Sequence, residues 1–75
     1  MTDKTVDARG LNCPLPILRA RKAMNEIPVG GTLEVLSTDP GSKADFAAFA
    51  RQTGNELLSS EQAGDCYRYV LRRNG

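Results

Sequence analysis

The chain has 75 residues, of which 40% are hydrophobic and 25% charged, and its formal net charge is +1. This composition is typical of a folded globular protein, and the length leaves room for one domain over residues 1–75 but for no second core. Ten basic against nine acidic residues argue against nucleic-acid binding driven by bulk charge. No apolar run is long enough to cross a bilayer, so no membrane partner is expected.

Histidine is absent, and the only cysteines are Cys13 and Cys66. Without histidine the chain lacks the usual general base and the commonest transition-metal ligand. Two cysteines are too few for a structural zinc site or a disulfide scaffold. We therefore expect no metal, no cofactor and free thiols. The N-terminus lacks the basic-then-apolar pattern of a signal peptide, so the expected location is the cytoplasm.

The first half of the chain predicts a strand, a helix and a second strand. Thr5–Ala8 alternates apolar and polar residues, as a short strand does. From residue 14 to about residue 26, apolar residues recur at helical spacing on one face, namely Ile17, Ala20, Met24 and Ile27. Pro28 ends this helix, and Thr32–Ser37 alternates again as the second strand.

A second helix is predicted to begin at Ser42. With Asp45 three positions later, this serine resembles a capping box in which aspartate takes the acidic role. Gly54 is well placed as the left-handed residue that ends the helix. The expected inner face consists of Phe46, Phe49, Ala50 and Thr53.

Two strands are predicted to complete the chain. Asn55–Ser59 is followed by a turn at Gln62–Asp65 and by a last strand at Cys66–Arg72. The resulting order βαβαββ favours an α+β fold, a two-layer α/β sandwich with a mixed four-stranded sheet and two helices on one face. Arg68 and Arg72 suggest that the other face of the sheet is open to solvent.

The segment from Gly10 to Pro16 reads Gly-Leu-Asn-Cys-Pro-Leu-Pro and is the most informative motif. Proline is tolerated only in a first helical turn, so Pro14 and Pro16 mark a helix start with Cys13 at or next to its N-cap. Gly10 would let the preceding turn adopt a positive φ. Free N–H groups and the helix dipole would lower the pKa of the Cys13 thiol. The alternative is a buried, inert cysteine.

A docking stripe is predicted next to this thiol. Leu15, Arg19 and Lys22 fall at positions i, i+4 and i+7 on one helix face, which would dock acidic partners. The plainer alternative is that these cations, together with Arg21, form only a solvated helix face.

Three acidic residues near the motif carry weaker expectations. Asp7 is expected to orient the Cys13 loop by accepting a backbone hydrogen bond, whereas Asp39 and Asp45 are interpreted as turn and cap residues.

Taken together, residues 10–16, the Thr-Asp-Pro-Gly-Ser turn at 38–42, residues 54–57 and the Tyr-Arg-Tyr strand at 67–69 resemble the TusA (SirA-like) family of sulfur carriers. The resemblance covers nearly the whole chain. It implies a two-layer α/β sandwich in which Cys13 accepts a sulfane sulfur as a persulfide and hands it to a cysteine of another protein.

The resemblance also implies partners: a sulfur-donor protein, either a cysteine desulfurase or a rhodanese, and a DsrE-like acceptor protein, with no direct nucleic-acid contact. Family members supply sulfur to tRNA thiolation, cofactor assembly or dissimilatory sulfur oxidation. Leu15 and the 38–42 turn are more similar to members associated with sulfur oxidation. Cys66 matches no functional position of the family.

Three other functions remain open on the residues alone. A thiol-redox module would need the distant Cys66, because Pro16 stands where a C-x-x-C pair has its second cysteine. A small RNA-binding domain would need more basic and aromatic surface. A regulatory interaction protein would leave Cys13 only a structural role. Exchange at a thiol needs no base of its own, so a carrier assisted by its partners fits this composition better than a self-sufficient enzyme does.

Overall fold

The structure is a computed structural model that describes residues 2–75, so Met1 of the expected domain lies outside the described residues. Its elements are β1 Lys4–Ala8, α1 Leu15–Met24, β2 Thr32–Ser37, α2 Ser42–Thr53, β3 Glu56–Ala63 and β4 Cys66–Arg72. The predicted element order is confirmed. Over residues 2–75, no helix is long and apolar enough to span a membrane.

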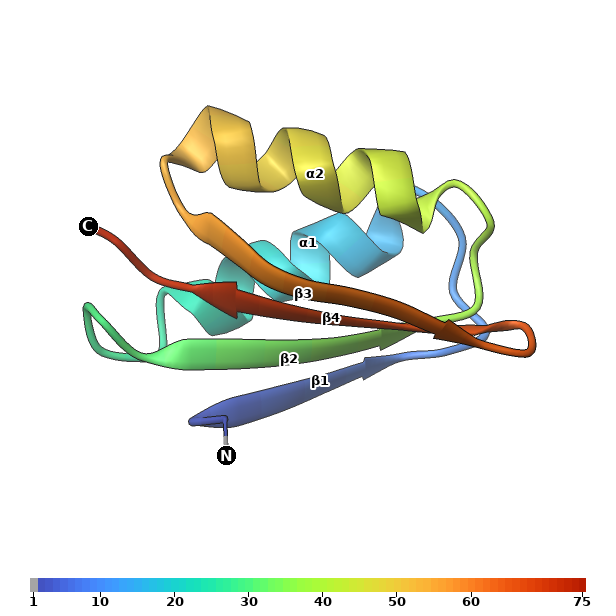
Figure 1. The fold of residues 1–75 in the computed structure, drawn as a ribbon, viewed down its shortest axis with the longest axis horizontal. Coiled ribbons are helices and arrows are strands. Elements are labelled where there is room, and N and C mark those ends of the chain that lie inside the picture. The colour runs from blue at the N-terminus through green and yellow to red at the C-terminus, as the bar shows by residue number, and fades with distance from the viewer. Residues whose placement is uncertain (1) are drawn as a thin grey trace.

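The four strands form one mixed sheet in the order β1-β2-β4-β3. β1 pairs with β2 in parallel, and the other two pairings are antiparallel. Both helices cover the same face of this sheet (Figure 1). The predicted α+β sandwich is therefore confirmed.

The parallel pairing places both helix starts at one edge of the sheet. β1 and β2 end at that edge, and the connections to α1 and α2 leave from there (Figure 1). Residues 9–14 and 38–41 thus become neighbours although more than twenty residues separate them in the sequence.

The core lies between the sheet and the helices. Its fully buried side chains include Leu33, Phe46, Tyr69 and Leu71. On the opposite face of the sheet Arg68 forms ion pairs with Glu34 and Glu61, as expected for a face open to solvent.

Several predicted boundaries differ from the structure. α1 ends at Met24 rather than near residue 26, and β3 continues to Ala63. The predicted turn therefore contracts to Gly64 and Asp65, because Gln62 and Ala63 pair with β4. Gly54 has φ 73°, which confirms the predicted left-handed helix end.

The predicted inner face of α2 is wrong at its last member. Thr53 is exposed, whereas Phe46, Phe49 and Ala50 are buried. The Thr53 hydroxyl turns back to donate a hydrogen bond to the Phe49 carbonyl at 2.7 Å, which satisfies it within its own helix.

The predicted capping box is also wrong. Gly41 is the N-cap of α2, and no side chain caps that helix. The Ser42 hydroxyl instead forms a buried hydrogen bond of 2.7 Å with the hydroxyl of Tyr69. The Tyr69 ring stacks on Phe46 with a centroid distance of 4.8 Å. A core contact between distant residues thus replaces the local cap.

The Ser42–Tyr69 pair predicts a stability effect. Tyr69→Phe should lower the free energy of unfolding by about 1–3 kcal/mol, because it leaves the buried Ser42 hydroxyl without a partner. In the Tyr69→Phe variant, Ser42→Ala should lower the free energy of unfolding much less than it does in the parent. Urea unfolding of the parent, the two single variants and the double variant would measure both losses. Additive losses would contradict a coupled pair.

Candidate functional site

Cys13 lies exposed at the start of α1, one residue before its N-cap Pro14. Leu15 and Pro16 are the first two helical residues, so the placement of Cys13 next to the N-cap is confirmed. The Cys13–Pro14 peptide bond is cis. Of the predicted motif residues, Pro14 is exposed and Pro16 is buried against the core.

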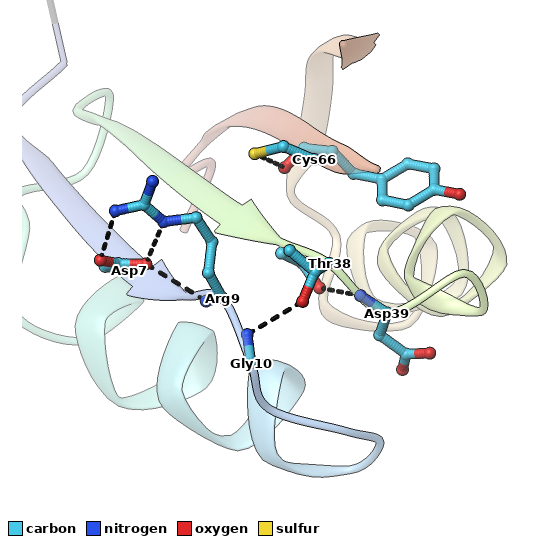
Figure 2. A network of polar contacts seen from close by, with 8 residues as sticks. Asp7, Arg9, Gly10, Thr38, Asp39 and Cys66 are labelled. Carbon is cyan, nitrogen blue, oxygen red and sulfur yellow. Dashed lines mark hydrogen bonds and ion pairs between the residues drawn. The ribbon is translucent and has the colours of Figure 1, made fainter. Parts of the chain in front are cut away.

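The connection between β2 and α2 holds both ends of the Cys13 loop. At the first end Gly10, with φ 82°, donates its N–H to the Thr38 hydroxyl at 2.9 Å (Figure 2). At the second end the Cys13 N–H donates to the Asp39 carboxylate at 3.1 Å. The other oxygen of Asp39 accepts the Gly41 N–H at 3.1 Å. Thr38 and Asp39 therefore fix the loop from which the thiol projects.

Asp7 accepts a backbone hydrogen bond, as expected, but from Arg9 at the start of the connection rather than from Cys13. Its carboxylate accepts the Arg9 N–H and binds the Arg9 guanidinium at 2.8 and 2.9 Å (Figure 2). These hydrogen bonds from Arg9 lower the pKa of Asp7 to about 2. Asp39, interpreted from sequence as a turn residue, accepts the Cys13 N–H instead.

A shallow groove of about 240 Å³ runs between the two helices and begins at Cys13. Its lining residues are Cys13, Pro14, Ile17 and Arg21 on the α1 side, and Asp45, Ala48, Phe49 and Gln52 on α2. The thiol therefore opens onto a surface built by both helices.

The predicted lowering of the Cys13 pKa is wrong. Desolvation by the surrounding atoms raises the pKa of the thiol, and the negative charges of Asp45 and Asp39 raise it further. Both effects favour the protonated thiol over the thiolate.

The prolines explain why the start of the helix does not lower the pKa of the Cys13 thiol. Neither Pro14 nor Pro16 has an N–H, and the Leu15 N–H donates to the Asn12 carbonyl at 2.9 Å. In the described part of the chain, the first turn keeps only the Ile17 N–H to offer a thiolate. The residues that mark the helix start thus remove the donors on which the prediction relied.

The predicted docking residues lie on the outer flank of α1. Leu15, two residues after Cys13, is 46% exposed, and Leu18, which the sequence reasoning did not single out, is 52% exposed. Arg19 and Lys22 line a separate groove of about 330 Å³ between α1 and the edge strand β1. The structure thus leaves Leu15 exposed outside the groove at Cys13 and directs the two cations toward β1.

Asp39 and Asp45 are the residues near the thiol whose role the sequence reasoning missed. A signal was available for Asp39, because it lies two residues after the second strand of a strand–helix–strand unit. For Asp45 no local signal exists, since its position depends on how α2 packs beside α1.

Cys66 lies at the start of β4, and its thiol contacts the Tyr67 carbonyl at 4.0 Å (Figure 2). Both cysteines are free. Cys66 and Arg68 line the same surface hollow, and Arg68 alternates with the core residues of β4, so this hollow lies on the open face of the sheet. Cys13 instead opens between the helices, on the other face. A redox cycle between the two thiols would have to bridge opposite faces of the sheet.

Comparison with known proteins assigns this architecture to one family. Residues 4–73 match the family described as "Sulfurtransferase TusA". A sulfur carrier protein TusA of Allochromatium vinosum is 51% identical over 96% of this chain and 95% of its own length. A putative sulfur carrier protein of Neisseria meningitidis is 55% identical over 96% of this chain and 97% of its own. The crystal structure of a SirA-like protein from Desulfitobacterium hafniense superposes with a TM-score of 0.77, at 29% identity, covering 96% of this chain and 99% of that one.

The charges around Cys13 predict the effect of removing one of them. Asp45→Asn should lower the pKa of the thiol and raise its alkylation rate at pH 7 severalfold, because it removes a negative charge that disfavours the thiolate. The measurement is the iodoacetamide rate against pH in a Cys66→Ser background. Glu56→Gln is the matched control, since it removes one exposed carboxylate from β3. Equal profiles for both variants would show that Asp45 does not act on the thiol.

Proposed function

Because the chain belongs to the TusA sulfurtransferase family, we propose that it is a sulfur carrier whose Cys13 holds sulfane sulfur as a persulfide. The observation that carries the proposal is the placement of Cys13, an exposed thiol on a loop clamped by Thr38 and Asp39 at the mouth of a groove. A thiol so placed is open to a partner protein and held in a defined position.

The chemistry needs two exchange steps. The Cys13 thiol loses its proton, and the thiolate attacks the outer sulfur of a donor persulfide. This forms the Cys13 persulfide and releases the donor thiolate. In the second step an acceptor thiolate attacks the outer sulfur on Cys13, taking that sulfur and restoring the Cys13 thiolate. No net oxidation occurs, and no histidine or metal is required of the carrier.

The raised pKa of Cys13 has consequences for both steps. A thiol that stays protonated provides little thiolate for attack, and a thiolate that is disfavoured is also a poor leaving group. The free carrier should therefore exchange sulfur slowly with chance thiols. Rapid transfer then depends on what the partner brings to the site.

The partners fall within the same proposal. The donor is a cysteine desulfurase or a rhodanese and the acceptor a DsrE-like protein, in a relay for sulfur oxidation or for tRNA thiolation and cofactor sulfur supply. Leu15 between the prolines favours the oxidation relay. Two free thiols are compatible with a reducing cytoplasm, where we place the protein.

Cys13 should be the sole carrier position. After incubation with a desulfurase and cysteine, Cys66→Ser should gain one sulfur atom by mass spectrometry and Cys13→Ser none, because only Cys13 opens onto the helix face. The added mass should disappear on reduction. Loading of Cys13→Ser alone would overturn the assignment.

The outer flank of α1 should steer partner binding. Arg19→Glu with Lys22→Glu should slow sulfur transfer severalfold at low salt and little at high salt, because exposed charges act mainly on association. Transfer rates would be measured across ionic strength, with melting curves as a check on folding.

Arg51→Glu with Arg72→Glu is the matched control for that experiment. It makes the same change in net charge at exposed positions near the end of α2 and on β4. If both double variants slow transfer equally, overall charge acts rather than a docking flank, and Arg19 and Lys22 are only solvated residues.

A further inference from the structure

The two walls of the groove beside Cys13 carry opposite charges. Arg21 lies on the α1 wall and Asp45 on the α2 wall. Neither forms an ion pair within residues 2–75. The ion pairs in that part of the chain involve other cations, namely Lys4, Arg9 and Arg68. Each wall therefore offers a charge that an occupant of the groove can satisfy.

The charges also lie at different distances from the thiol. Asp45 lines the groove together with Cys13, close enough for its carboxylate to act on that thiol by charge and by a side-chain hydrogen bond. Arg21 follows seven residues after Pro14, about 10 Å along the helix axis. An extended peptide covers that distance in about three residues.

The size and lining of the groove limit what it can hold. Its volume of about 240 Å³ is below the roughly 300–1,000 Å³ of pockets that enclose drug-sized ligands. The apolar residues of its lining are Ile17, Ala48 and the buried Phe49. Such a furrow suits a few residues of a protein segment better than an enclosed small molecule.

We infer that this groove receives the cysteine-bearing segment of the partner protein, with a cation beside the partner's cysteine facing Asp45 and a carboxylate about three residues away facing Arg21. The inference rests on the proposed carrier function and identifies the partner segment by its charge order. A cation over Asp45 would also stabilise the Cys13 thiolate, which forms in one exchange step and leaves in the other. Correct docking and activation of the thiol would then be one event.

Synthetic peptides test this charge order directly. The matched peptide is acetyl-Gly-Lys-Cys-Gly-Gly-Glu-Gly-amide, and the swapped peptide exchanges its lysine and glutamate. Cys13 would first be loaded with inorganic polysulfide in a Cys66→Ser background, and loading verified by mass. Transfer to the peptide thiol would then be followed at low salt. The matched peptide should accept sulfur about threefold to tenfold faster, as expected for two exposed charge pairs.

A charge-reversed carrier separates docking from the intrinsic reactivity of the peptides. A neighbouring lysine activates a cysteine in any peptide, but that effect cannot change with the carrier. In the double variant Arg21→Glu with Asp45→Lys, the swapped peptide should accept sulfur faster than the matched peptide. In the uncharged double variant Arg21→Gln with Asp45→Asn, the ratio of the two transfer rates should fall to the ratio measured for the same peptides with a small disulfide. Melting curves would confirm that these variants fold.

The failures of the two proposals are distinguishable. If neither inorganic polysulfide nor a desulfurase with cysteine loads Cys13, the carrier function fails and the groove inference falls with it. If Cys13 loads but neither peptide takes sulfur from it, only the groove inference is overturned. If both peptides accept sulfur and the charge-reversed carrier keeps the preference of the parent, the carrier function stands and the groove inference is overturned.

Discussion

Because β1 and β2 run parallel, both strands deliver their C-terminal ends to one edge of the sheet, and each following helix begins there. This pairing brings the Cys13 loop against the connection between β2 and α2. Thr38 and Asp39 can then accept the N–H groups of Gly10 and Cys13. An antiparallel pair would place the two connections at opposite edges, and the thiol would have neither its backbone clamp nor a groove between helices.

The carboxylate that positions Cys13 also disfavours its thiolate. Asp39 accepts the Cys13 N–H, yet its charge and that of Asp45 raise the pKa of the same thiol. For a self-sufficient enzyme this combination would be a defect, since the reactive form would be scarce. In the carrier function that we propose, it would separate storage from transfer, because sulfur on Cys13 would exchange slowly until a partner changed the electrostatics around the thiol. In that proposal the carrier provides the position of the thiol and the complex provides its reactivity.

The helix face and the open face of the sheet carry different kinds of groups. The helix face holds Cys13, the groove beside it and the exposed leucines of α1. On the open face of the sheet, Arg68 bridges Glu34 and Glu61 across three strands, which leaves those charges occupied with one another. Arg21 and Asp45, which have no ion-pair partners within residues 2–75, both line the groove beside the thiol. Recognition on the helix face need not compete with the contacts that stabilise the sheet.

The sequence by itself determined the six elements, their order, the two-layer arrangement and the placement of Cys13 at a helix start. These features follow from local rules, because helical and strand periodicity and the backbone limits of proline act over a few residues. Only the tertiary structure decided that Ser42 bonds Tyr69 rather than capping its helix, and that Asp39 rather than Asp7 holds Cys13. It likewise decided that the thiol is less acidic than expected. Each of these depends on residues at least 26 positions apart, and spacing along a chain carries no information about which distant groups the packing of a sheet and its helices will bring into contact.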